Sequence, residues 1–156
     1  MPRTAQLDLS VSYGVPRRGL PSAASFRQWV EAALHGRIKR ADLALRIVGD
    51  YEGRSLNRHY RGKDYATNVL SFPAELPPGV NLPVLGDIVL CAPVVLKEAR
   101  LQGKDPKAHF AHLTVHGTLH LLGFDHDDAR DAEAMEALER DILDGLGFDD
   151  PYRDDE

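Results

Sequence analysis

One stretch of the sequence constrains the possible folds of this chain more than any other stretch. It runs from His116 to His126 and reads H-G-T-L-H-L-L-G-F-D-H. Residues 108–115, just before it, lack Gly and Pro and repeat apolar side chains at helical spacing, so His116 and His120 are expected one turn apart on one helix face. Gly123 can adopt the left-handed conformation that ends a helix, which lets the chain turn back and bring His126 to the same place. Three neutral imidazoles with one open position are typical of a catalytic zinc site rather than a structural one.

The same H-x3-H-x5-H spacing occurs in the metzincin peptidases, whose pattern is H-E-x-x-H-x-x-G-x-x-H. Gly117 stands where those peptidases carry the glutamate that serves as general base. The spacing therefore supports a metal site and argues against a metzincin-type protease. A metal-dependent hydrolase of peptides or of small phosphoesters stays open as an alternative.

Other ionisable residues lie beside these histidines. His112, one turn before His116, is expected to hydrogen-bond inside the core or to line the pocket, and its rival interpretation is a metal ligand. His109 is near the start of the helix and is expected to be exposed. Asp125 and Asp127 flank the third histidine, where either could orient an imidazole. Asp125 is alternatively a direct ligand.

Four basic residues, Arg54, Arg58, Arg61 and Lys63, fall within ten positions. Arginine suits phosphate because its planar guanidinium can donate two parallel hydrogen bonds. The cluster is therefore either a solvated helix and turn or an anion-binding patch beside the metal, and its spacing does not decide between them.

Alternating and short apolar runs predict four strands, at 5–13, 42–49, 67–73 and 85–91. Helical spacing, caps and glycines predict about five helices, at 22–36, 55–60 and 93–102, from 105 through the first two histidines, and from Asp127 or Asp128 to Gly145. No linker divides the chain, so we predict one α+β domain over residues 1–147 with a small mixed four-stranded sheet. The acidic residues 148–156 are expected to be a disordered tail.

Composition restricts the cellular compartment and the kinds of partner that we expect for this chain. No apolar run is long enough to span a membrane and the N-terminus has no signal-peptide pattern, so no membrane partner is expected. Cys91 is the single cysteine, expected to be a buried, inert thiol without a disulfide partner, which fits the reducing cytoplasm. The net charge of −5 hides an asymmetry, since residues 1–107 hold 16 Lys and Arg against 10 Asp and Glu, and residues 108–156 hold 3 against 14.

The histidine run, combined with L-N-R-H-Y-R-G-K-D-Y-A-T-N-V-L-S-F-P (56–73) and L-G-D-I-V-L (85–90), resembles the bacterial YbeY family of metal-dependent endoribonucleases. The resemblance extends from Leu43 to Leu143, with the three motifs in the same order and at the same separations.

The resemblance implies that His116, His120 and His126 bind one zinc ion and that Arg61 is functionally important. We take these four residues as the catalytic set. The family's role implies that the partners are single-stranded ribosomal RNA and the ribosome or small-subunit proteins. The expected function is maturation of the 3′ end of small-subunit ribosomal RNA, together with ribosome quality control.

Two questions stay open at this stage. No general base replaces the absent glutamate, so the nucleophile is either a water or the 2′-hydroxyl of the RNA. A non-enzymatic alternative is a ribosome-assembly factor in which zinc only holds the last two helices together.

Overall fold

The computed structural model describes residues 6–125 and 127–153. Four strands form one sheet: β1 (Gln6–Tyr13), β2 (Arg40–Val48), β3 (Val69–Pro73) and β4 (Val84–Cys91). The described residues also form five helices: α1 (Ala23–Leu34), α2 (Asp50–Arg61), α3 (Ala92–Gln102), α4 (Pro106–Leu121) and α5 (Ala129–Gly145). The predicted α+β class and the small mixed four-stranded sheet are confirmed.

The sheet has the order β1-β2-β4-β3. The pairs β1–β2 and β2–β4 are parallel, whereas β3 runs antiparallel to β4 at the edge. Parallel neighbours need a crossover connection, and α1 provides it between β1 and β2. The connection from β2 to β4 contains α2 and β3, which places the end of α2 close to the antiparallel edge of the sheet.

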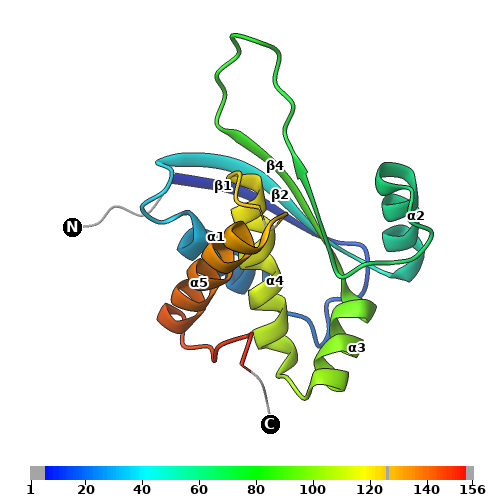
Figure 1. Cartoon of the computed structure of the whole chain (residues 1–156). Coiled ribbons are helices and arrows are strands. Elements are labelled where there is room, and N and C mark those ends of the chain that lie inside the picture. The colour runs from blue at the N-terminus through cyan, green and yellow to red at the C-terminus, as the bar shows by residue number, and fades with distance from the viewer. Residues whose placement is uncertain (1–5, 126, 154–156) are drawn as a thin grey trace.

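The two faces of the sheet bury two separate clusters, as the alternation of side chains along β4 shows. Ile88 and Leu90 point into the main core with α1 and α4, whereas Val89 and Cys91 point into a smaller cluster that includes Leu56 of α2. In Figure 1, α1, α4 and α5 gather on one side of the sheet and α2 stands apart from them at the other end. The face beside α2 is therefore only partly covered.

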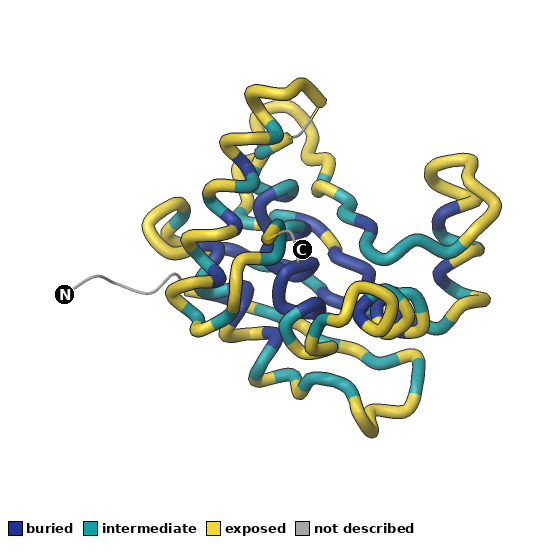
Figure 2. Tube along the Cα trace, turned by 60° about the horizontal axis from the view of Figure 1, so that its bottom comes forward, coloured by how far each residue is buried: buried dark blue, intermediate teal, exposed yellow. Residues whose placement is uncertain are grey.

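Helix α4 is the centre of the molecule. It begins at Pro106 after the cap Asp105, whose side chain accepts a hydrogen bond from the amide of Lys107. Gly123 has a φ of +100°, so the chain leaves the helix as the sequence predicts. α4 is buried on nearly all sides between the sheet and the other helices, as the dark blue helical segment in the middle of Figure 2 shows.

Helix α2 is longer than the predicted 55–60 and begins at Asp50. The sequence did not predict the first turn of α2 because Gly53 lies within it and glycine is unfavourable in the interior of a helix. The structure gives the reason for it, since a Cβ at Gly53 would lie 3.0 Å from the Sγ atom of Cys91. Close packing of α2 on the end of β4 therefore requires glycine here.

Cys91 is buried, as predicted, and burial raises the pKa of its thiol. None of the helices within residues 6–125 and 127–153 is long and apolar enough to cross a membrane.

The prediction that residues 148–156 are disordered stays a prediction. In the part that the structure describes, this segment lies against α5. Tyr152 folds back and hydrogen-bonds to Glu139 of α5, and the amide of Tyr152 donates to the carboxylate of Asp150.

Candidate metal centre

His116 and His120 lie where the spacing predicts, one turn apart near the end of α4. Their Nε2 atoms are 3.1 Å apart, and both side chains are partly buried. Two nitrogens bound to one tetrahedral zinc at about 2.0–2.1 Å would be roughly 3.3 Å apart. The pair therefore fits two ligands of a single ion with little rearrangement. The predicted third ligand, His126, lies outside the described residues.

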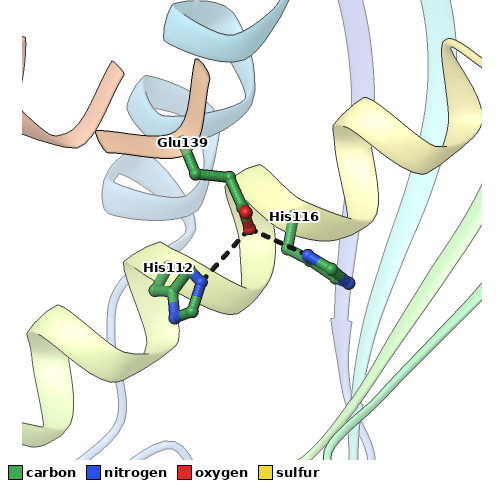
Figure 3. Close-up of side chains that lie close together, drawn as sticks. All are labelled: His112, His116 and Glu139. Atoms are coloured by element: carbon green, nitrogen blue, oxygen red, sulfur yellow. Dashed lines mark hydrogen bonds and ion pairs between the residues drawn. The ribbon is translucent and has the colours of Figure 1, made fainter. Parts of the chain in front are cut away.

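The other ring nitrogen of His116 is held by Glu139 of α5. His116 Nδ1 donates to Glu139 Oε1 over 2.8 Å, and Glu139 has no exposed surface. Figure 3 shows this carboxylate reaching from α5 towards α4, between His112 and His116. Because the proton is on Nδ1, the lone pair of His116 is on Nε2, the atom that faces His120. A carboxylate in this position fixes the orientation of a metal-binding histidine and raises the basicity of the nitrogen that binds the metal.

Glu139 is saturated by further donors. His112 Nε2 lies 3.1 Å from Oε1, and the hydroxyl of Tyr152 donates to Oε2 over 2.6 Å. Burial alone would raise the pKa of Glu139, but the hydrogen bonds from His112, His116 and Tyr152 outweigh it and lower this pKa to about 2. The carboxylate is thus ionised at neutral pH, while burial and its contact with Glu139 raise the pKa of Tyr152.

His112, His116 and Glu139 also form a cluster that could itself hold a metal ion, because their ligand atoms lie within 4.8 Å of one another. An ion there would displace the hydrogen bonds that Glu139 accepts, and the full burial of Glu139 would leave no position open to substrate. His116 and His120, by contrast, are both only partly buried. The geometry therefore favours Glu139 as the group that orients His116.

A cleft of about 600 Å³ opens beside His116 and His120. Its other walls are the end of α2, with Tyr60 and Arg61, and the segment 67–73 that contains β3. The structure thus brings Arg61 into the same cleft as the two histidines, which the sequence could not establish. Arg54, by contrast, forms a two-pronged ion pair with Asp64, with nitrogen–oxygen distances of 2.8 and 2.9 Å, and does not line the cleft.

Gly117 packs against the floor of this cleft. A Cβ on Gly117 would lie 3.2 Å from both the Oγ atom of Ser71 and the Cγ2 atom of Ile88. A glutamate at this position, as in the peptidase pattern, would therefore fit only if the side chains of Ser71 and Ile88 moved by a few tenths of an ångström. Within the described part of the chain, no carboxylate lines the cleft.

His109 is buried, with 5% of its surface exposed, so the prediction that it is exposed is wrong. Its Nε2 lies 2.9 Å from Glu98 Oε1 of α3, and the same oxygen accepts a hydrogen bond from Asn68 Nδ2 over 3.0 Å. Burial lowers the pKa of His109, against the opposing effect of Glu98. Since Asn68 lines the cleft, Glu98 connects the cleft wall to the start of α4.

The prediction for His112 is confirmed, whereas Glu139 and Tyr152 were not predicted from the sequence. His112 is buried in a hydrogen-bonded core position, as expected. A signal for Glu139 exists, because it lies four residues after Met135 and four before Leu143, on the buried stripe of α5. A charged residue on such a stripe needs a buried partner.

Asp125 and Asp127 sit in the turn between α4 and α5. The carboxylate of Asp125 accepts a hydrogen bond from the amide of Asp127 over 2.9 Å. The described contact gives Asp125 a local role in this turn, and its predicted roles at the metal stay predictions.

Comparisons with known proteins identify the family of this chain. The chain matches the family model described as Endoribonuclease YbeY over residues 20–147. Proteins named Endoribonuclease YbeY from Xanthomonas oryzae pv. oryzae (strain MAFF 311018), Xanthomonas axonopodis pv. citri (strain 306) and Stenotrophomonas maltophilia (strain K279a) are each 68% identical over 151 residues, which cover 94% of this chain and 94% of each relative.

The solution structure of TM1509 from Thermotoga maritima has a TM-score of 0.60 and 22% sequence identity, and the match covers 94% of this chain and 99% of that one. This likeness shows the fold alone. The family model and the sequence relatives show more: the chain belongs to the YbeY family of endoribonucleases.

Proposed function

We propose that this protein is a zinc-dependent endoribonuclease that cuts single-stranded RNA. We further propose that it acts in the cytoplasm, in maturation of the 3′ end of small-subunit ribosomal RNA and in ribosome quality control. The observation that carries the proposal is that Arg61 shares one cleft with His116 and His120. A cation that binds phosphate and a pair of metal-binding imidazoles are the parts that phosphodiester cleavage needs.

Each residue has a proposed role. His116, His120 and His126 would hold the zinc, which when bound would lower the pKa of a coordinated water towards ~7 or polarise a phosphoryl oxygen. Arg61 donates hydrogen bonds to the phosphoryl oxygens and stabilises the charge that develops on them. Glu139 keeps His116 in the protonation form that leaves Nε2 available to the ion.

The nucleophile can be identified from the ends of the product. The described residues of the cleft supply hydroxyl groups from Thr67 and Ser71 but no carboxylate that could act as a general base. Attack by the RNA's own 2′-hydroxyl would leave a 2′,3′-cyclic phosphate, whereas attack by water would not. Mass spectrometry of the cleaved fragments separates the two routes.

Docking on a ribosome or on small-subunit proteins is part of the proposal. Non-specific affinity for RNA rests on basic surface, and this chain has a net charge of −5 with its acidic residues concentrated after residue 107. Contacts with a partner surface would then select the RNA site that is cut, because the overall charge of this chain does not favour RNA binding.

The test compares wild type with Arg61→Ala, with zinc content measured on both. Wild type should bind one zinc and cut single-stranded RNA, but neither duplex RNA nor casein. Arg61→Ala should stay folded and keep its zinc while the cleavage rate falls by about 10²–10³-fold. Arg54→Ala is the matched control, because Arg54 pairs with Asp64 away from the cleft, and it should cut RNA at the wild-type rate. Casein cut while RNA stays intact would overturn the proposal.

A further inference from the structure

Two aromatic side chains form a ridge at the rim of the cleft. Tyr60 extends from the last turn of α2 with 61% of its surface exposed, and Phe72 extends from β3. Their ring centroids are 5.0 Å apart and the ring planes are inclined by 57°. An exposed tyrosine braced by a second ring offers a flat, rigid surface to a ligand.

A second hollow lies on the other side of this ridge. It has a volume of about 360 Å³ and shares both Tyr60 and Phe72 with the cleft. Its apolar lining includes Ala44 and Val89 on the sheet face that α2 covers only in part, and Leu56 of α2 itself. We call this hollow the outer groove. The ridge thus joins the outer groove directly to the cleft that holds Arg61.

Charge distinguishes the outer groove from the cleft. The guanidinium of Arg46 is already bound by both carboxylate oxygens of Glu52, with nitrogen–oxygen distances of 2.6 and 2.9 Å. Asp87 adds an exposed carboxylate at the same groove. A phosphate would be repelled here, whereas a neutral, flat ring would not. The cleft with Arg61 therefore suits a phosphate, and the ridge and outer groove suit the base next to it.

We propose that the Tyr60–Phe72 ridge and the outer groove bind the nucleobase adjacent to the scissile phosphate of single-stranded RNA. This inference rests on the proposed function. Stacking on an aromatic side chain requires a base that is unpaired and turned out of a helix. The subsite therefore also explains a preference for single strands, since a duplex keeps its bases away from the ridge.

Steady-state cleavage of a labelled single-stranded RNA by the zinc-loaded full chain tests the subsite. Loss of one stacking contact weakens binding by about 10- to 100-fold, so Tyr60→Ala should raise KM by that factor and change kcat by less than about threefold. Tyr60→Phe keeps the ring and should behave as wild type. Tyr51→Ala is the matched control on the same helix, because Tyr51 is 89% exposed and lines neither hollow.

Abasic substrates locate the base. Removing the bases of the RNA one at a time should raise KM at one position next to the cut in wild type, and that penalty should disappear in Tyr60→Ala. An unchanged KM for Tyr60→Ala, with wild-type sensitivity to every abasic position, overturns the subsite and leaves the nuclease intact.

Binding measured by fluorescence anisotropy separates this failure from failure of the proposed function. If wild type cuts no RNA, the nuclease proposal fails. The subsite is then decided by whether Tyr60→Ala weakens binding of the uncut strand by at least tenfold relative to Tyr60→Phe. Equal affinity of the two variants would overturn it.

Discussion

The two halves of α4 use histidine in different ways. In the first half, His109 and His112 are buried, and each places Nε2 against a carboxylate from a neighbouring helix. In the second half, His116 and His120 line the cleft and place their Nε2 atoms 3.1 Å apart. Four residues of one type on one helix thus include two that support the core and two that can hold an ion.

The difference lies in which ring nitrogen the carboxylate occupies. Glu139 contacts His112 through Nε2 and His116 through Nδ1. Nε2 is the ring nitrogen farther from the backbone. A carboxylate bound to Nε2 occupies this nitrogen, as in His112, whereas a carboxylate bound to Nδ1 leaves Nε2 available, as in His116, where it faces His120. Glu139 can therefore hold His112 in the core and orient His116 for metal binding.

The largest effect on stability should come from Glu139→Ala. This change leaves the donors of buried His112 and of partly buried His116 and Tyr152 without their acceptor, so the free energy of unfolding should fall by about 3–5 kcal/mol. Urea denaturation at pH 7.5 without metal measures it. Glu133→Ala, exposed on the same helix, should change stability by less than about 0.5 kcal/mol. A loss below 1 kcal/mol for Glu139→Ala would show that the network does not support the core.

A smaller loss is expected from Tyr152→Phe. The phenol donates to a buried, ionised carboxylate over 2.6 Å, so its removal should cost about 1–2 kcal/mol. Tyr65→Phe is the control, because Tyr65 is 57% exposed. If the two variants unfold at the same urea concentration, the hydrogen bond from Tyr152 to Glu139 does not stabilise the fold.

The smallest effect concerns pH and His109. Burial lowers the pKa of His109, so the unfolded chain takes up this proton before the folded one does. The stabilisation is complete above the ordinary value near 6.5 and decreases as pH falls below it. Protonation would also place a second donor on Nδ1, which has no partner among the described residues.

Urea denaturation between pH 7.5 and 5.5 checks this sign. His109→Gln keeps a donor for Glu98 but removes the titration, so its stability should depend less on pH than that of wild type. The difference in slope should be at most about 1.4 kcal/mol per pH unit. Identical slopes, or a steeper one for His109→Gln, would contradict the neutral, buried state of His109.

Local periodicity predicted much of this molecule. Strands and helices followed from repeats of two and 3.6 residues, and the pairing of His116 with His120 follows from one helical turn. The mistake at His109 has a non-local cause, because the partner that makes burial tolerable is Glu98 on another helix. The position of His109 within α4 does not predict its contact with Glu98.

The site beyond the histidines depended on the pairing of distant elements. Arg61 reaches the cleft because β3 pairs antiparallel with β4 and packs beside α4, and no pattern within 50–73 encodes that arrangement. Glu139 was predictable in principle from its place on an apolar stripe. Tyr152 was not, since a short acidic segment gives no periodic signal.

The most direct test of this account is the zinc affinity of matched glutamine variants of His112, His116 and His120, measured by competition with a chromophoric chelator. Loss of an outer-shell partner usually costs about 10- to 100-fold in metal affinity. His116 and His120 are proposed as direct ligands, so we expect His116→Gln and His120→Gln to lose more than about 100-fold. His112 hydrogen-bonds to Glu139 rather than to a proposed ligand, so we expect His112→Gln to lose no more than about 10-fold. The account is contradicted if His112→Gln loses zinc as severely as His116→Gln while His120→Gln retains it, because the ion would then sit at Glu139.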